Sequence, residues 1–464
     1  MAISRRNFLL GSSAIAVAGV SPQRAPAQTG PVPQGEVVLS GGYVLSLDPV
    51  IGDLPKGDVH IRNGAIIAIA ASIPAPGVPR RDMSGRVVMP GFVDSHWHMW
   101  NSIARGFGNS RLGPFAKSMG ALSRVWTPEA SALSVRLACA EAVQSGITTV
   151  NNWAHNIKAR DFADAEVEAQ KASGLRGRFS YGYPQPIGKA VMMDLDGIEI
   201  MRNEEFTEKN RGLLSLGICV RGPDRCEPVA WRGEWAGARE FKLPITSHIA
   251  SDRAAAAMGG ISTLHREGLL GPDVLLVHAT HASPSDLRLL AETKSPLSIS
   301  PWTELEVGYG LPPLAQMMDA RVPMSLSVDN MVLAGNADMF GVMRVTADLA
   351  AGMAEKQGAL SDRMALQWAT MGGAEALGIS KLVGSLTVGK RADLIAVRMD
   401  SLNTNPVKNV DFLLTHAARP NDVDFVMIDG VVHKENGRHT RVDVPALLAE
   451  STEMMRRLRI QADI

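Results

Sequence analysis

The segment from Val87 to His98 reads VVMPGFVDSHWH, a short apolar run that ends in two histidines one residue apart. Alternate residues of a β-strand point to the same face, so His96 and His98 are predicted to converge while Trp97 points the other way. A single His-x-His pair is weak evidence for a metal site, because paired surface histidines are common. Its place at the end of an apolar strand makes it a candidate.

Two further strand ends supply similar groups. One apolar stretch ends in Thr-Ser-His at His248, and another ends in Ser-Leu-Ser-Val-Asp at Asp329. Three imidazoles and one carboxylate, from His96, His98, His248 and Asp329, can hold a catalytic metal and leave a position for water. We therefore predict one divalent metal ion at these four residues.

The pattern of apolar and polar residues changes twice along the chain. Residues 34–88 read as short strands, residues 89–380 alternate short apolar strands with amphipathic helices, and residues 381–440 return to strands before a helix at 441–464. The expected strands of the middle section are 87–94, 146–150, 178–183, 216–220, 244–247, 274–277, 297–300 and 324–328. This pattern predicts an α/β fold, a (β/α)8 TIM barrel inserted in a small β-sandwich built from the N- and C-terminal segments.

Functional groups of such barrels sit at the carboxyl ends of the strands. Six of the 11 histidines lie at predicted strand ends on this one rim: His96, His98, His155, His248, His278 and His281. A divalent metal held by neutral imidazoles lowers the pKa of its water toward 7 and makes hydroxide available. Asp329 can accept that proton and pass it to the leaving group, and His278 can hydrogen-bond the water or polarise the atom under attack.

Composition excludes some partners. The 464 residues carry 47 Lys and Arg against 47 Asp and Glu, a formal net charge of zero, which gives no electrostatic case for nucleic acid. The three cysteines do not form a disulfide framework or a thiolate metal motif. We expect a small-molecule substrate, no nucleic-acid partner and no membrane span.

The first residues read as a targeting segment. Arg5 and Arg6 precede an apolar run over residues 8–20, and Ala25-Pro26-Ala27 fits a small-residue cleavage site. The apolar run is about 13 residues long, too short for a bilayer that requires roughly 20. We expect residues 1–27 to be a twin-arginine signal peptide and the mature protein to be periplasmic.

These motifs resemble those of the amidohydrolase superfamily, in particular its cytosine deaminase and s-triazine hydrolase (chlorohydrolase and aminohydrolase) branch. The resemblance extends over nearly the whole mature chain and rests on residues 90–98, 248, 277–278, 327–329 and 384–394. It implies Zn²⁺, with Fe²⁺ as the alternative, at the four ligands above, and a catalytic role for His278. It also implies hydrolytic replacement of an exocyclic group on a heterocycle, and a homodimer.

The chain departs from the family pattern at two points. Binuclear members carry a carboxylated lysine at the end of the fourth strand, whereas residues 219–224 contain no lysine, which indicates a single metal ion. Deaminase-like members carry a glutamate three residues after the fifth-strand histidine, to protonate the ring nitrogen. That position is Ser251 here. The candidates to replace this glutamate as the proton shuttle are Glu304, Glu306, Asp252 and Asp224.

Other residues near the strand ends are candidates for contact with the substrate. The predicted substrate-binding residues are Trp97, Arg105, His155, Arg221, His281, Trp302 and Glu304. Each also has a purely structural interpretation. Trp97 can pack beneath its strand, Arg105 can cap a helix, and Arg221 can pair with Asp224; the histidines can be hydrogen-bonded loop residues.

The leading hypothesis is a metal-dependent hydrolase that uses a metal-bound hydroxide to cleave a C–N bond of a small, heterocyclic nitrogen compound. Deamination is the first form of this reaction. Hydrolysis of an amide, urea or carbamate is the second and gains weight from Ser251, and hydrolytic dechlorination is the third. The alternative from another class is a non-catalytic periplasmic metal- or ligand-binding protein, against which the intact ligand set argues.

Overall fold

The computed structural model describes residues 35–107, 109–110, 113–207, 212–406 and 408–464, so the predicted signal peptide lies outside the described residues. Eight parallel strands form one sheet in the order β15-β14-β13-β12-β11-β10-β9-β6. Their bounds are β6 (Phe92–Trp97), β9 (Ile147–Ala154), β10 (Arg176–Tyr181), β11 (Leu214–Cys219), β12 (Ile245–Ile249), β13 (Val274–His278), β14 (Leu297–Ile299) and β15 (Met324–Leu326). A parallel bridge between Trp97 and Asp329 brings the two outer strands of this sheet together, so the barrel nearly closes.

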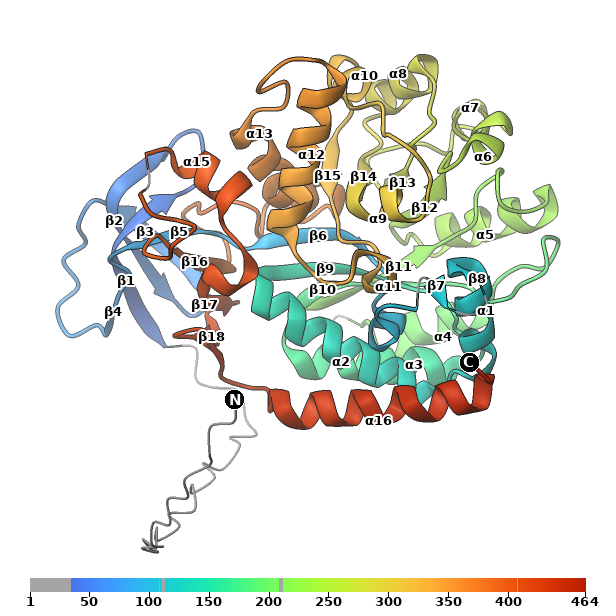
Figure 1. Cartoon of the computed structure of the whole chain (residues 1–464), viewed down its shortest axis with the longest axis horizontal. Helices are drawn as coiled ribbons and strands as arrows, with labels where there is room; N and C mark the ends of the chain where they lie inside the picture. Colours follow the sequence, from blue (N-terminus) through green and yellow to red (C-terminus); the bar gives the residue numbers. More distant parts are fainter. Residues whose placement is uncertain (1–34, 108, 111–112, 208–211, 407) are drawn as a thin grey trace, which may run out of the picture. The chain divides into compact units, whose positions relative to one another are not determined.

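Helices follow the barrel strands and pack around them (Figure 1). The longer ones are α1 (Phe115–Val125), α2 (Pro128–Ser145), α3 (Arg160–Ser173), α4 (Leu195–Glu204), α5 (Pro228–Glu240), α8 (Pro284–Thr293), α12 (Met339–Met353) and α16 (Val444–Ala462). The shorter ones are η1 (Met99–Ala104), α6 (Arg253–Ala257), α7 (Gly260–Arg266), α9 (Pro301–Glu306), α10 (Leu314–Asp319), α11 (Met331–Ala334), α13 (Asp362–Gln367), η3 (Trp368–Gly372), α14 (Gly373–Ala376) and α15 (Val410–Phe412). Within the described residues, no helix combines the length and apolar character needed to cross a membrane.

The N- and C-terminal strands build one mixed sheet, in the order β19-β18-β17-β16-β5-β1-β2-β3 with β4 beside β1. Its strands are β1 (Glu36–Leu45), β2 (Asp53–Arg62), β3 (Ala65–Ala70), β4 (Arg80–Asp82), β5 (Arg86–Pro90), β16 (Leu394–Arg398), β17 (Val423–Ile428), β18 (Val431–Glu435) and β19 (Arg438–His439). The sheet has an apolar core of its own, with Val59, Ile66 and Phe425 among its members. The predicted fold class is confirmed: a barrel inserted into a β unit made from both ends of the chain.

The predicted first barrel strand, residues 87–94, is in fact divided between the two sheets. β5 pairs with β1 and β16 of the outer sheet, and β6 pairs with β9 of the barrel. Gly91 separates them, and a Cβ at that position would overlap the side chain of Thr148. The chain can pass between the sheets here because glycine lets the two backbones approach closely.

Candidate active site at the barrel rim

The closure of the barrel brings three of the predicted ligands together through the backbone. The His98 amide donates to the Asp329 carbonyl at 2.7 Å, and the Asp329 amide donates to the His96 carbonyl at 3.0 Å. Below this seam the buried Asp94 carboxylate accepts from the amides of His96 and Val328, at 3.1 and 2.9 Å. Backbone and buried carboxylate therefore fix the register of the two strands that carry the candidate ligands.

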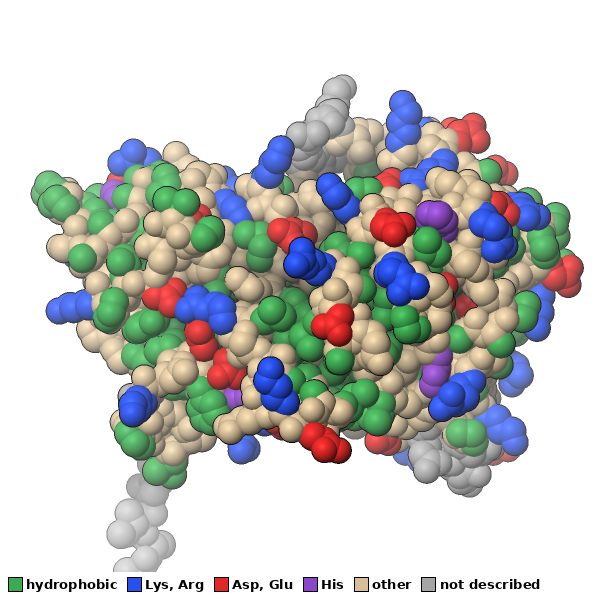
Figure 2. Space-filling model, turned by 90° about the horizontal axis from the view of Figure 1, so that it is seen from above, with side chains coloured by type: hydrophobic (Ala, Val, Ile, Leu, Met, Phe, Trp, Pro, Cys, Tyr) green, Lys and Arg blue, Asp and Glu red, His purple; other side chains and the backbone are tan. Residues whose placement is uncertain are grey.

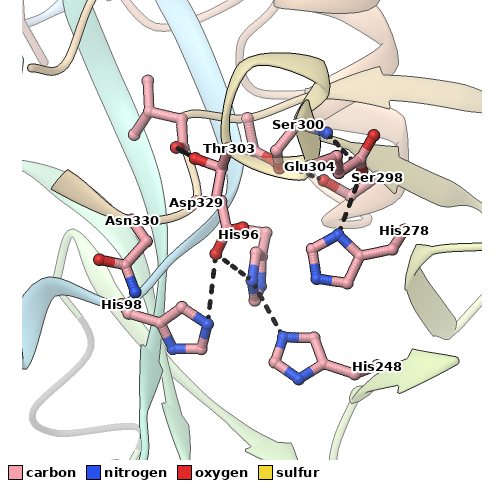
Figure 3. Close-up of polar contacts among 12 residues, drawn as sticks. His96, His98, His248, His278, Ser298, Ser300, Thr303, Glu304, Asp329 and Asn330 are labelled. Atoms are coloured by element: carbon pink, nitrogen blue, oxygen red, sulfur yellow. Dashed lines mark hydrogen bonds and ion pairs between the residues drawn. The ribbon is translucent and has the colours of Figure 1, made fainter. Parts of the chain in front are cut away.

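The side-chain donors converge at this seam (Figure 3). His96 Nε2 lies 3.1 Å from Asp329 Oδ1 and 3.2 Å from His248 Nε2, and His98 Nε2 lies 3.3 Å from Asp329 Oδ1. Ligand atoms at zinc bond lengths around a tetrahedral centre lie about 3.3 Å apart. The spacing of these four donors therefore fits one divalent metal ion.

The charge states of these groups suit metal binding. Burial lowers the pKa of His96 to about 3 and that of His248 well below its usual value, so both imidazoles are neutral at pH 7. Burial opposes ionisation of Asp329, but its contacts with His96 and His98 outweigh burial and hold the pKa of its carboxyl far below the ordinary range. Neutral imidazole and ionised carboxylate are the forms that coordinate a metal.

His155 lies behind His98 and sets its orientation. The indole Nε1–H of Trp100 donates to His155 Nδ1 at 2.9 Å, so this nitrogen is an acceptor. His98 Nδ1 lies 3.1 Å from the same atom, and the favourable arrangement places a proton on His98 Nδ1, which shares this acceptor with the indole. That tautomer leaves the lone pair of His98 Nε2 directed at the other donors, as a ligating histidine requires.

His278 is held by a carboxylate in the same way. Glu304 is fully buried, and its Oε1 lies 3.1 Å from His278 Nδ1 while it also accepts from the Ser300 amide at 2.9 Å (Figure 3). The ring thus carries its proton on Nδ1 and presents Nε2 to the site. One ring nitrogen of His278 shares a 4.8 Å cluster with atoms of His96 and Asp329, so His278 is placed to be a ligand itself as well as to contact water or substrate.

Two residues of this cluster adopt a backbone conformation that side chains rarely tolerate. His278 has a φ of 75° and Asp329 a φ of 62°. Left-handed conformations at non-glycine residues are uncommon and concentrate at functional sites, where the surrounding structure sustains the strain. Both residues stand where a strand ends and the chain turns over the barrel mouth, as in an active site.

A cavity of about 490 Å³ opens over the cluster and receives four of its side chains, from His98, His248, His278 and Asp329. Of the predicted substrate-binding residues, His155 and Arg221 line this cavity. Arg221 is not free to bind substrate, because its guanidinium forms a buried ion pair with Glu234 and donates to the Gly188 carbonyl at 3.0 Å.

The other predicted substrate-binding residues do not line the cavity. Trp97 is fully buried beneath the rim, and Trp302 packs against Gly341 of α12. Arg105 pairs with Glu141 of α2, and His281 Nε2 donates to the Tyr309 carbonyl at 2.6 Å. Glu304 lies behind His278, as described above.

The predicted replacements for the missing glutamate also lie elsewhere. Glu306 is exposed, Asp252 caps α6 by accepting from the Ala255 amide at 2.8 Å, and Asp224 accepts from the Ala250 amide at 2.8 Å. Position 251 is filled by a hydroxyl, not a carboxylate, and it accepts a hydrogen bond from Arg225.

Sequence reasoning missed Arg225 and Tyr309, which line the cavity beside Ser251. Arg225 stands in the loop after β11, so its place after a barrel strand was the only signal in the sequence. Its direction depends on Ser251, which follows the next strand of the barrel, β12. No spacing rule along the chain reveals that contact.

Comparison with known proteins agrees with this architecture. The sequence matches the model of the amidohydrolase family over residues 87–432. It is 28% identical to the 5'-deoxyadenosine deaminase of Methanococcoides burtonii, over 86% of this chain and 92% of that one. It is also 28% identical to the 5-methylthioadenosine/S-adenosylhomocysteine deaminase of Syntrophobacter fumaroxidans, over 89% of this chain and 96% of the relative.

Solved structures show the same fold. A zinc-bound adenosine deaminase from Xanthomonas campestris superposes with a TM-score of 0.82 at 24% identity, over 92% of this chain and 99% of that one. Atrazine chlorohydrolase from Arthrobacter aurescens TC1, complexed with zinc, gives 0.81 at 21% identity, over 90% and 99%. Since the family model spans most of the sequence, this chain belongs to the amidohydrolase family.

Proposed function

We propose that this protein is a metal-dependent deaminase that replaces the exocyclic amino group of a small nitrogen heterocycle and releases ammonia. The observation that carries the proposal is the convergence of His96, His98, His248 and Asp329 at the barrel rim, where His96 lies 3.1 Å from Asp329 and 3.2 Å from His248, and His98 lies 3.3 Å from Asp329. The named relatives that span nearly the whole chain are deaminases of adenine nucleosides. They support an aminopurine nucleoside as the first substrate to test.

The reaction assigns a separate task to each group. A divalent ion, Zn²⁺ in our proposal, would be held by His96, His98, His248 and Asp329, and when bound it supplies a water of lowered pKa as nucleophile. The histidine contacts of Asp329 use Oδ1, so Oδ2 is available to accept the proton of the attacking water. His278 Nε2, fixed by Glu304, contacts the atom under attack or the water beside it.

A second candidate reaction is hydrolysis of an amide, urea or carbamate bond. It is favoured by one feature: among the described residues that line the cavity, Asp329 is the only carboxylate. Deamination of an aromatic ring requires a proton at the ring nitrogen, and Ser251 is a much weaker acid than a carboxylic acid. A bond whose carbonyl is polarised directly has no such requirement.

Ammonia release separates these reactions. The zinc-loaded protein is incubated with 5'-deoxyadenosine, 5'-methylthioadenosine, adenosine, cytosine and aminotriazines, with Asp329→Asn as the matched inactive variant. We expect ammonia from at least one purine nucleoside, and none from the variant. If no compound of this panel releases ammonia and an N-acyl or carbamate substrate is hydrolysed, the second candidate reaction would replace deamination. Chloride release from a chlorotriazine would identify dechlorination.

We also propose that residues 1–27 direct export of the folded enzyme to the periplasm. The support is the sequence alone: the Arg5-Arg6 pair, the short apolar run and the small-residue site that follows. Replacing both arginines by lysine should retain the protein inside the cell, as fractionation with a periplasmic marker would show. Equal export of the double variant would refute the twin-arginine assignment.

A homodimer is proposed on the family resemblance alone. Light scattering of the purified mature chain measures its mass directly. We expect twice the mass of one chain, and a monomer at micromolar concentration would contradict it.

A further inference from the structure

The charges that line the cavity are strongly unequal. Four cationic side chains line it, Arg124, Lys189, Arg221 and Arg225, against the single carboxylate of Asp329. On the face of the molecule shown in Figure 2, by contrast, basic and acidic side chains are interspersed, and the whole chain carries no formal net charge. The excess of positive charge is therefore a property of the cavity.

Only one of these cations is neutralised by a partner in the described part of the chain. Glu234 pairs with Arg221, and Asp329 belongs to the metal cluster. The side chains of Arg124 and Lys189 are exposed and form no ion pair among the described residues. A divalent metal would add further positive charge, so the cavity favours an anionic ligand over a neutral one.

Arg225 is the cation best placed to bind such a ligand. One of its terminal nitrogens donates to Ser251 Oγ, which anchors the guanidinium beside the strand that carries His248. Its Nε is buried and has no hydrogen-bond partner among the described residues. No ion pair joins Arg225 to a carboxylate of the described residues, although its charge acts on the neighbouring Asp224, whose Oδ2 accepts from the Ala250 amide.

Arg225 uses one terminal nitrogen to donate to Ser251 and lines the cavity where a ligand would bind. Because its Nε is closed to solvent, Arg225 would meet a ligand in the cavity with its terminal nitrogens, whose charge-assisted hydrogen bonds favour an anionic oxygen. The planar fork of arginine matches a carboxylate or a phosphate, which can accept two parallel hydrogen bonds. The hydroxyl at position 251 anchors Arg225 without the ion pair that a carboxylate at that position would form.

We propose that the substrate carries an anionic oxygen group, a carboxylate or a phosphate, which Arg225 binds while the reacting carbon lies over the metal cluster. This inference names the substrate class of the function proposed above and rests on it. Arg124 and Lys189 attract the same group toward the cavity before it reaches Arg225. The shared chemistry is an anionic oxygen pair, and the two sources are separated by experiment.

The test uses small probes so that it does not depend on turnover. Benzoate, phenyl phosphate and the neutral isostere benzamide are titrated calorimetrically into the zinc-loaded wild type, Arg225→Gln and Arg225→Lys. Arg232→Gln is the matched control, since Arg232 pairs with Glu267 on the surface. We expect an anion to bind the wild type about 10- to 100-fold more tightly than benzamide, as charge-assisted hydrogen bonds predict.

Arg225→Gln should abolish this preference, Arg225→Lys should retain part of it, and Arg232→Gln should leave it unchanged. Whichever of benzoate and phenyl phosphate binds more tightly identifies the carboxylate or the phosphate. Equal binding of benzoate, phenyl phosphate and benzamide to the wild type would overturn the proposal, even if the Arg225 variants fold poorly. So would an anion preference that survives in Arg225→Gln.

A kinetic measurement separates this proposal from the proposed deamination. 5'-Methylthioadenosine is compared with its analogue that carries a carboxymethyl group on sulfur. Preference for the carboxylate, lost in Arg225→Gln through KM, would support both proposals. Anion binding without ammonia from either nucleoside would retain the receptor and argue against deamination of adenine. Ammonia from both at equal kcat/KM would retain deamination and overturn the anionic substrate.

Discussion

The cavity has two unlike walls. The metal wall, formed by His96, His98, His248 and Asp329, consists of neutral imidazoles and one ionised carboxylate fixed at the seam of the barrel. The cation wall, formed by Arg225 with Ser251 and Tyr309, carries a charge with no acidic partner in the described chain. The metal wall holds groups that any hydrolysis at this rim requires, whereas the cation wall holds groups that select the substrate. Substitutions in one wall therefore test its role separately from the other.

The largest effect is expected at the metal wall from Asp329→Asn. The amide cannot accept the proton of the attacking water and is a poor ligand, so kcat should fall about 10²- to 10⁴-fold. Bound zinc, measured by elemental analysis, should also decrease. Asp319→Asn, at the exposed end of α10, is the matched control and should change neither. Full turnover in Asp329→Asn would refute the metal-dependent mechanism.

Lowering the pH should reduce the folding stability that the buried histidines of the metal wall and His155 provide, whereas the charge of the cation wall should not change. Burial holds the pKa of His96 near 3, and those of His155 and His248 also lie below the usual value. In the unfolded chain these histidines bind a proton below about pH 6.5, whereas in the folded chain they stay neutral there. The stability that neutral imidazoles provide is therefore complete above that pH and is lost as pH falls toward 3. Arginine stays charged throughout.

Chemical denaturation of the metal-free protein at pH 7, 6 and 5 would measure this loss. Each such histidine contributes about 1.4 kcal/mol per pH unit to the slope below pH 6.5. His155→Asn should reduce the slope by one such contribution, whatever it does to the stability at pH 7. His265→Ala, which changes a histidine outside the site, is the control. An unchanged slope in His155→Asn would mean that His155 is already protonated in the folded state.

Much of the fold and the metal wall could be predicted from the sequence because both depend on local pattern. Short apolar runs separated by amphipathic helices identify a parallel barrel, and the eight predicted strands all occur, with shifted bounds. His98 is an instructive deviation, since it lies just after β6 at the start of η1 and not within the strand. It still meets the other donors because its amide is bound to the Asp329 carbonyl.

The cation wall could not be predicted in this way, because its geometry comes from contacts between distant segments. Arg225 points into the cavity because Ser251 anchors it, and Arg221 is withdrawn because Glu234 of α5 pairs with it. Spacing along the chain distinguishes neither arginine from the other. Glu304 illustrates the same limit: its place after a strand suggested a proton shuttle, yet α9 turns it behind His278.

Glu304→Gln tests whether that carboxylate acts through His278. The amide can still accept at its oxygen, but it no longer stabilises a protonated imidazole, so kcat should fall about 10- to 100-fold. The loss should appear in kcat and not in KM, and the affinity for neutral ligands should stay unchanged. Glu306→Gln, two residues further along α9 and exposed, is the control. A loss of folding stability with an unchanged kcat in the folded variant would indicate a purely structural role for Glu304.

The smallest expected effect lies one contact further from the metal, at Trp100. Trp100→Phe removes the indole N–H that keeps His155 Nδ1 an acceptor, so His98 loses the preference for the ligating tautomer. Zinc affinity should fall about tenfold, the lower end for such outer contacts, as chelator competition would show. Trp126→Phe is the matched control, because the centroid of the Trp126 ring lies 5.3 Å from that of Trp100 and its buried Nε1 has no hydrogen-bond partner in the described part of the chain. Equal losses in both variants would assign the effect to packing, and a loss confined to Trp100 would establish that this indole sets the tautomer of the metal wall.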